Sequence, residues 1–194
     1  YPTSLSVKSP LLGGDYKLAF DLAPVGLVLS RNRAIVDCNQ HLCDMFGASR
    51  EVLLGQSFQV LYPSAAEYER LGARMLPILN TSGHYADDRV MKRATGELFW
   101  CHVSGRALNR SAPHEAGIWS FEDLSARRTV KAELTPRERE VAAHLMGGGK
   151  TSKEIARALG ISHRTVEVYR ARLMRKYKAA TTADLVHKLV TGGA

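Results

Sequence analysis

The sequence predicts two domains: an α+β N-terminal domain built on one antiparallel sheet, and an all-α C-terminal domain that contains a helix-turn-helix. Three observations lead to this prediction. Residues 15–125 combine strand-like runs with short helical segments, residues 135–194 carry helical signals only, and positive charge is concentrated in the second part. A length of 194 residues, with 45% hydrophobic and 24% charged residues, suits such globular domains.

The N-terminal domain, residues 15–125, is expected to hold two strands, then short helices, then three strands. Apolar runs at 26–30 and 34–38 flank a polar turn, and residues 94–96 form a later hairpin turn. The remaining strands are expected at 85–93, 97–108 and 117–122, and helices at 15–22, 40–46, 49–54 and 65–79. Elements in this order form an α+β domain with one antiparallel sheet.

A polar segment without glycine or proline, residues 126–134, is expected to form a helical connector to the C-terminal domain, residues 135–194. Charge is divided unevenly between the two parts. Residues 1–128 hold 14 Lys and Arg against 13 Asp and Glu, whereas residues 129–194 hold 13 against 6. A neutral domain joined to a small basic one indicates that the basic domain binds a polyanion.

The sequence shows no apolar run long enough to cross a bilayer and no signal peptide. Its three cysteines are an odd number without a paired framework or a metal-ligand spacing. These features predict a cytoplasmic protein with no membrane segment and no metal site.

The stretch GGGKTSK at residues 147–153 raises an alternative, a nucleotide-binding P-loop and therefore an enzyme. A P-loop needs a glycine five positions before its Gly-Lys-Thr and a buried strand upstream. That position is His144, and the preceding residues read as a helix with a capping box at Thr135 and Glu138. We therefore expect the glycines to end one helix and Thr151 to begin the next, and we do not expect an enzyme.

The residues after Thr151 follow the pattern of a helix-turn-helix. A small residue, Ala156, lets two helices cross closely, Gly160 four positions later makes the turn, and Val166 fixes the second helix to the first. The second helix is expected over residues 163–178, with an apolar stripe of Val166, Tyr169, Leu173 and Tyr177.

An alternative for this helix is a solvated basic helix on an ordinary bundle, because runs of charge often have no partner. Between Lys150 and Lys178, however, there are nine basic and two acidic residues, in the same segment as the turn pattern. The combination favours nucleic-acid binding.

Four segments carry a family resemblance: LTPREREV at 134–141, SKEIA at 152–156, GIS at 160–162 and RTVEVYRAR at 164–172. They resemble the four-helix DNA-binding domain of LuxR-type regulators and are most similar to its FixJ-like branch. The resemblance implies a bacterial transcription regulator that binds double-stranded DNA as a homodimer, with the last helix, residues 182–190, contributing to the dimer.

The resemblance also implies which side chains meet DNA. The base-reading candidates are Arg164, Glu167, Val168 and Ala171. The phosphate-binding candidates are Thr151, Ser152, Lys153, Thr165, Arg172 and Lys176. In this scheme Glu167 accepts from a cytosine amino group and Val168 contacts a thymine methyl; alternatively, Glu167 pairs with Arg170 on the helix surface.

The N-terminal domain resembles a PAS domain, which implies a sensor or dimerisation module. The resemblance rests on Asn39, MFG at 45–47, SREVLLG at 49–55, KRATGELFW at 92–100 and EDLS at 122–125. It implies a cavity lined by one face of the sheet, for which the candidates are Phe99, Cys101, Val103, Gly105, Trp119 and Phe121. The alternative is that these residues are plain core. Gly105 among large neighbours suggests free volume.

The resemblance disfavours the two best-known PAS cofactors. Haem-binding relatives place a histidine on the long helix, but none occurs between His41 and His84, and the Asn-Cys-Arg-Phe setting of flavin-binding light sensors is absent. No cofactor is evident, and we expect a small apolar or aromatic organic ligand or none. The overall prediction is a DNA-binding regulator controlled by a PAS sensor, and the alternative from another class is a PAS interaction module whose basic tail is incidental.

Overall fold

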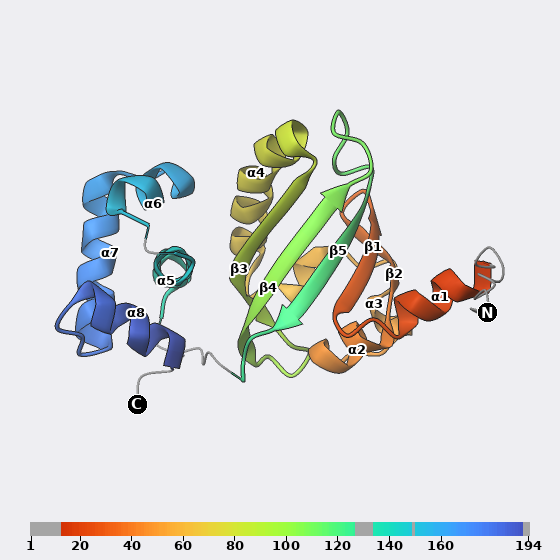
Figure 1. Ribbon diagram of the computed structural model, residues 1–194, viewed down its shortest axis with the longest axis horizontal. Helices are drawn as coiled ribbons and strands as arrows, with labels where there is room; N and C mark the ends of the chain where they lie inside the picture. Colours follow the sequence, from red (N-terminus) through yellow and green to blue (C-terminus); the bar gives the residue numbers. More distant parts are fainter. Residues whose placement is uncertain (1–12, 127–133, 149, 192–194) are drawn as a thin grey trace, which may run out of the picture.

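The computed structural model describes residues 13–126, 134–148 and 150–191. It places them in two domains that lie side by side, one built around a sheet and one made of helices (Figure 1). The predicted fold class is confirmed. The predicted helical connector, residues 126–134, lies almost entirely outside the described residues.

The N-terminal domain contains five strands and several helices in the predicted order. The strands are β1 Gly26–Arg31, β2 Ala34–Cys38, β3 His84–Lys92, β4 Leu98–Ala107 and β5 Ala116–Asp123. The helices are α1 Gly13–Asp21, α2 Gln40–Phe46, α3 Arg50–Leu53, the 3-10 helix η1 Phe58–Leu61 and α4 Ala65–Ser82. The strands pair antiparallel in the order β2-β1-β5-β4-β3. Only η1 was not predicted, because four residues are too few for a helical period.

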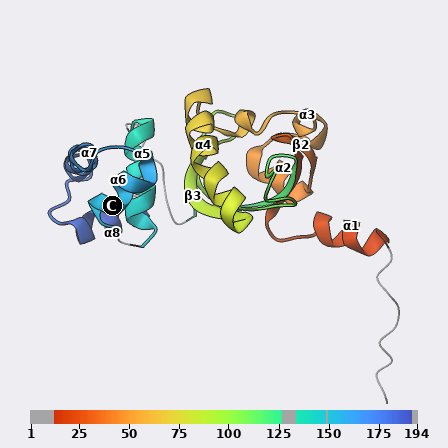
Figure 2. The same cartoon turned by 90° about the horizontal axis from the view of Figure 1, so that it is seen from above.

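The two faces of the sheet have different neighbours, since successive side chains along a strand point to opposite sides. The inner face, with Phe99 and Phe121, packs against α2, η1 and α4 and forms the main core. On the outer face, Val90 and Trp100 are buried against the C-terminal domain. α4 lies beside β3, at the side of the N-terminal domain that faces the C-terminal domain (Figure 2).

Asn39 holds together three elements at one end of the sheet. Its side chain is fully buried and makes four hydrogen bonds. Oδ1 accepts from the amides of Leu27 and Leu42, and Nδ2 donates to the carbonyl oxygens of Phe20 and Val25. The residue therefore caps α2 while it fixes β1 and the segment that follows α1.

Replacing Asn39 by Ala should lower the free energy of unfolding by about 2–4 kcal/mol, because the change leaves buried backbone groups without partners and removes a helix cap. Urea denaturation followed by circular dichroism measures the loss. Gln40→Ala, at the exposed neighbouring position, is the control and should change stability by less than about 0.5 kcal/mol. Equal losses in the two variants would contradict the role of Asn39.

The C-terminal domain consists of α5 Pro136–Met146, α6 Ser152–Leu159, α7 His163–Lys176 and α8 Thr182–Thr191. The predicted capping box at Thr135 with Glu138 is present, and a second capping box, Thr151 with Glu154, stands where the next helix was expected to begin. Gly160 adopts a φ of +63°, in the left-handed region that favours glycine, and so turns the chain between α6 and α7. The helices share a core that includes Leu145, Ile155, Val166, Leu173, Leu185 and Leu189.

The domains meet through α5, which faces α4 and β3 (Figures 1 and 2). Arg139 Nη2 donates to Glu67 Oε1 at 2.8 Å, and both side chains are buried. Arg70 Nε donates to Glu140 Oε1 at 3.2 Å. An ion pair buried in this way contributes little net stability, but losing one partner is costly, so the pair favours one docking geometry.

His144, on α5, faces the space between the two domains. Burial, together with the positive charges of Arg74 and Lys150, lowers the pKa of His144 from 6.5 to about 4. Lys150 Nζ lies 3.3 Å from His144 Nδ1, which is consistent with a neutral imidazole that accepts a hydrogen bond. Between pH 6.5 and 4, the unfolded chain therefore binds a proton at this residue more readily than the folded chain does.

The free energy of unfolding should therefore fall as the pH decreases from 6.5 toward 4, and His144→Gln should make this decrease less steep. Urea denaturation at about pH 7 and about pH 5 compares the variant with the original chain. His187→Gln, which alters an exposed histidine on α8, is the matched control and should leave the pH dependence nearly unchanged. If His144→Gln leaves it unchanged as well, His144 does not lose its proton affinity on folding.

Candidate nucleic-acid interface and sensor cavity

Helix α7 has one buried side and one exposed side. Val166, Leu173 and Tyr177 are buried against the other helices, as the predicted stripe requires, and Tyr169 is half-buried. The opposite side exposes all four predicted base-reading residues: Arg164, Glu167, Val168 and Ala171. Val168 is 44% exposed, unusual for a large apolar side chain. The helix lies on the side of its domain away from the sheet (Figures 1 and 2), so the N-terminal domain does not cover it.

The turn before α7 is held by backbone and side-chain hydrogen bonds. The amide of Ile161 donates to the carbonyl oxygen of Ala156 at 3.1 Å, and Ser162 Oγ accepts from the amide of Thr165. Arg170 joins three helices, since its guanidinium donates to Ser152 Oγ on α6 and to Thr182 Oγ1 on α8. Composition and spacing did not single out Arg170 for this bridging role, because its two partners are far away in the sequence.

The six predicted phosphate-binding residues differ in how they are presented. Lys153 and Arg172 are exposed, as is Thr151, whose Oγ1 caps α6. Thr165 is half-buried beside Ser162. The side chains of the other two, Ser152 and Lys176, are hydrogen-bonded within the protein.

The side chain of Ser152 is buried under Arg170, which leaves its backbone amide at the start of α6 as the group placed to meet an anion. Lys176 Nζ donates to Glu138 Oε2 at 2.7 Å. The Glu138 carboxylate therefore competes with a phosphate for the Lys176 ammonium group.

Glu167 has charged neighbours on its own helix. One carboxylate oxygen lies 3.7 Å from His163 Nε2 and 3.8 Å from Arg170 Nη1. The side chain is half exposed. These contacts are loose, so the surface pairing considered as an alternative from the sequence coexists with an exposed carboxylate.

A concave region of the surface lies beside Glu167, between the starts of α6 and α7 and the start of α8. Basic side chains from one loop and two helices surround it: Lys150, Lys153, His163 and Arg170. The GGGKTSK stretch thus borders this concavity. A helix, α5, precedes the stretch instead of the strand that a P-loop requires.

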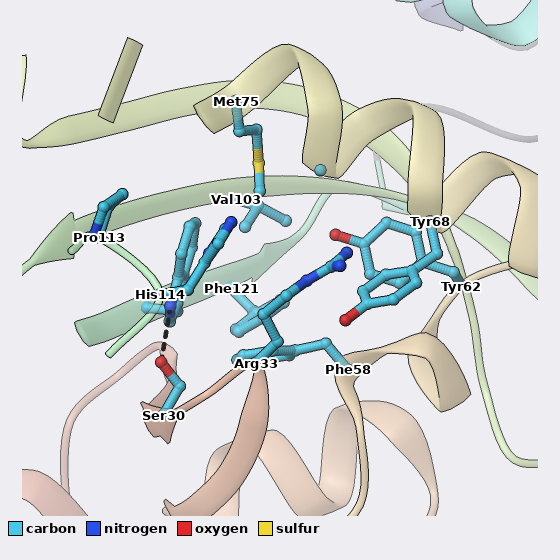
Figure 3. Close-up of a pocket in the computed structure, with 12 residues that line it drawn as sticks. Ser30, Arg33, Phe58, Tyr62, Tyr68, Met75, Val103, Pro113, His114 and Phe121 are labelled. Atoms are coloured by element: carbon cyan, nitrogen blue, oxygen red, sulfur yellow. Dashed lines mark hydrogen bonds between the residues drawn. The ribbon is translucent and has the colours of Figure 1, made fainter. Parts of the chain in front are cut away.

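The N-terminal domain contains a cavity of about 30 Å³ between the inner face of the sheet, η1 and α4 (Figure 3). Three of the six predicted residues line it, namely Val103, Trp119 and Phe121. Phe99 and Cys101 lie on the same face of β4 but belong to the packed core, where the ring of Phe99 meets that of Phe46 at a centroid distance of 5.3 Å.

The interpretation of Gly105 as a source of free volume is wrong. The indole of Trp119 lies directly over this glycine, and a Cβ built on Gly105 would stand 2.2 Å from a ring atom. Gly105 is therefore required for the close packing of Trp119, and it is not among the residues that line the cavity.

The remaining lining comes largely from segments that strand alternation does not reach. It includes Ser30, Arg33, Phe58, Tyr68, Met75 and His114. Arg33 belongs to the β1–β2 turn, Phe58 to η1 and His114 to the β4–β5 loop. The one sequence signal for Arg33 is its place in a short polar turn between two strands.

The three cysteines are buried free thiols. Burial raises the pKa of Cys38 and of Cys101 to about 12, so both remain protonated at neutral pH. Within the described residues, no three His, Cys, Asp or Glu side chains are grouped as metal ligands would be. No helix in the described ranges has the length and hydrophobicity needed to span a membrane.

Comparisons with known proteins match both halves of the chain. Residues 132–189 match the model of the luxR family of bacterial regulatory proteins, and residues 24–126 match that of the PAS domain. The tetrathionate response regulatory protein TtrR of Salmonella typhimurium is 48% identical over 101 residues, which are 50% of this chain and 48% of TtrR. The chain spans between 22% and 48% of the length of the first curated relatives that it matches.

Two solved structures are similar in fold. The PAS domain of a LuxR-family transcriptional regulator from Burkholderia thailandensis, in complex with ethanol, is 63% identical; the match covers 57% of this chain and 98% of that one, with a TM-score of 0.56. The LuxR-type receptor VqmA of Vibrio cholerae is 23% identical and covers 94% of this chain and 89% of its own, with a TM-score of 0.54. The second likeness extends the agreement in fold to both domains. The chain therefore belongs to the PAS domain family and ends in a helix-turn-helix domain of the luxR family of bacterial regulatory proteins.

Proposed function

We propose that this chain is a bacterial transcription regulator that binds double-stranded DNA as a homodimer under the control of its PAS domain. The observation that carries the proposal is the exposed side of α7, where Arg164, Glu167, Val168 and Ala171 lie together on a domain rich in positive charge. A helix whose buried side is fixed by the other helices and whose exposed side carries polar groups fits the major groove. We expect such a regulator to act in the cytoplasm. Its proposed function includes no catalytic step.

In this proposal the exposed side chains of α7 divide into two roles. Glu167 accepts a hydrogen bond from a cytosine amino group, Val168 contacts a thymine methyl, and Arg164 and Ala171 lie against the neighbouring base edges. Lys153, Arg172 and the amides at the start of α6 contact phosphates and set the register of the protein on DNA. The names of TtrR and of the Burkholderia regulator, both regulatory proteins, support the assignment.

Exposed apolar residues support dimerisation through the N-terminal domain. Leu29, Val36 and Ile118 lie on the outer face of the sheet, on the strands that the C-terminal domain leaves uncovered, and are 40–47% exposed. Leu18 and Leu22, on or next to α1, are more exposed still. A second copy of the chain would bury these groups, and α8 would add a second contact between the DNA-binding domains.

The PAS cavity supports control by a small molecule. Its volume of about 30 Å³ favours a ligand much smaller than haem or flavin. The related Burkholderia domain was solved with ethanol, a molecule of three non-hydrogen atoms. A ligand of that order of size suits this cavity.

Helix α4 is the proposed route from the cavity to the DNA-binding domain. Tyr68 and Met75 line the cavity, while Glu67 and Arg70 pair with residues of α5. A ligand that moves α4 therefore acts on the contact that holds the C-terminal domain in place. Coupling of this kind needs one element with two arrangements that both sites bias.

Glu67→Gln should loosen the docking of the two domains, because Arg139 keeps its buried charge but loses its carboxylate partner. Trp100, which is 2% exposed beneath the C-terminal domain, should then become accessible to a soluble quencher. Acrylamide quenching in a Trp119→Phe background measures this, with Glu115→Gln at an exposed position as the matched control. Unchanged quenching in Glu67→Gln would show that the ion pair does not hold the domains together.

Two variants on α7 test the DNA-binding roles. Glu167→Ala should relax the preference for one base by about 1 kcal/mol or more, measured by selection from a random DNA library. Arg172→Ala should instead weaken binding to all sequences alike and reduce the dependence of log K on log salt by about one. A base preference that survives Glu167→Ala would remove this residue from the base-reading set, and a sequence-dependent loss in Arg172→Ala would contradict its phosphate role.

A further inference from the structure

Arg33 places a buried hydrogen-bond donor without a partner at the cavity. Among the described residues, Arg33 Nη2 is one of four buried side-chain nitrogens that donate no hydrogen bond, and Arg33 lines the cavity. Its guanidinium lies 4.1 Å from the centre of the Tyr68 ring, and Nη1 is 3.5 Å from Glu69. Figure 3 shows the side chain reaching from the turn into the space beside Tyr68 and Tyr62.

An unpartnered buried donor is unfavourable, since it has lost its water without gaining an acceptor. The backbone at this position is unfavourable as well. Asn32 and Arg33 occupy the two central positions of the β1–β2 turn with φ of 49° and 63°. Such turns favour glycine at the second of these positions, so the arginine is present despite a conformational penalty.

Several other polar groups of the cavity already have partners. Trp119 Nε1 donates to Ser30 Oγ at 3.1 Å, and Ser30 Oγ donates to the carbonyl oxygen of Gly117. Tyr62 Oη accepts from Arg89 Nη1 at 2.7 Å. The rest of the wall includes apolar groups of Phe58, Val103 and Phe121. Among the residues that line the cavity, Arg33 Nη2 is thus the buried side-chain nitrogen that still needs an acceptor, and the half-buried imidazole of His114 stands in the same wall.

The volume restricts the size of whatever supplies this acceptor. A water molecule needs about 10–15 Å³ of such space, and a cavity that binds benzene measures about 150 Å³. At about 30 Å³, the cavity takes a molecule of a few non-hydrogen atoms and excludes an aromatic ring. The sequence predicted a small apolar or aromatic ligand; the cavity volume restricts this to a short molecule with one polar end.

We propose that the cavity binds a short-chain oxygenated organic molecule whose oxygen accepts a hydrogen bond from Arg33 Nη2. An alcohol, a ketone or a carboxylate of three or four non-hydrogen atoms has the required chemistry. Its carbon atoms lie against Phe58, Val103 and Phe121, and its oxygen lies toward α4. The inference rests on the proposed sensor function and assigns to Arg33 the choice of ligand.

Nuclear magnetic resonance on the ¹⁵N-labelled full chain tests the proposal. The chain has two tryptophans, and the indole N–H of Trp119 lies in the cavity wall, so its cross-peak reports occupancy. Trp100→Phe assigns the two peaks. The probes are ethanol, acetone and sodium acetate, which carry an oxygen, and xenon, which fills apolar cavities without accepting a hydrogen bond.

In the original chain, at least one oxygenated probe should shift the Trp119 peak saturably, and the comparison of the three identifies the preferred oxygen. Arg33→Met should weaken that probe at least about tenfold while leaving xenon binding within about twofold. Arg31→Met, which alters an exposed arginine beside the same turn, is the matched control and should bind both like the original chain.

Gly72→Ala provides a second variant that keeps the arginine. A Cβ at Gly72, on α4, would stand 2.7 Å from Arg33 Nη2 and push the guanidinium aside, whereas alanine itself favours the helix. This variant should also weaken the oxygenated probe.

Three results would overturn the proposal. If xenon binds and no oxygenated probe does, or if Arg33→Met binds the oxygenated probe as tightly as the original chain, the role of Arg33 is wrong while the cavity remains a ligand site. If neither xenon nor any probe binds, the sensor part of the proposed function fails with it. DNA binding by α7 is measured separately and is unaffected by these outcomes.

Discussion

Alternation of side chains along the central strands is the constraint on which this structure depends. Because neighbouring residues of β4 point to opposite faces, Phe99 and Val103 enter the core and cavity while Trp100 faces outward. The outward residues then need their own cover, which the C-terminal domain provides for Val90 and Trp100. A single layer of backbone thus separates the cavity from the surface on which the DNA-binding domain is docked.

Two ion pairs contribute to the docked arrangement, beside the apolar contacts of Val90 and Trp100 with the C-terminal domain. Arg139 and Glu67 are both nearly inaccessible, and a second pair, Arg70 and Glu140, lies close by. Burying such groups costs desolvation energy that their attraction only roughly offsets. Other docking geometries would leave these charges without partners. The ion pairs therefore make the contact selective for one arrangement, and the proposed control by the PAS domain would act on this contact.

The C-terminal domain was the more predictable half of the molecule, because its signals are local. A capping box needs residues three apart, and Gly160 and Val166 lie on either side of one turn, so short-range spacing defined the helices and the exposed side of α7. The ion pair of Lys176 with Glu138 was missed for the opposite reason. It joins residues 38 positions apart, and no local pattern records that proximity.

The sensor cavity was predicted only in part for the same physical reason. The resemblance to a PAS domain implied Val103, Trp119 and Phe121, but a family resemblance carries no information on how rings fill the space between them. The indole of Trp119 packs directly over Gly105, so this glycine allows close packing instead of leaving the free volume that was expected. Arg33 reaches the cavity from a turn, and its importance depends on a missing hydrogen bond that only coordinates can reveal.

Helix α4 has its two sets of contacts on adjacent sides of one rigid rod. Tyr68 and Gly72, four residues apart, face Arg33, while Glu67 and Arg70, three residues apart, face α5. If cavity occupancy changes the affinity for an operator, thermodynamic reciprocity requires that the operator change the affinity for the small molecule by the same factor. A regulator bound to the chromosome would then respond to a different concentration range of the small molecule than a regulator that diffuses freely. Each promoter would therefore determine the small-molecule concentration at which the regulator bound to it responds.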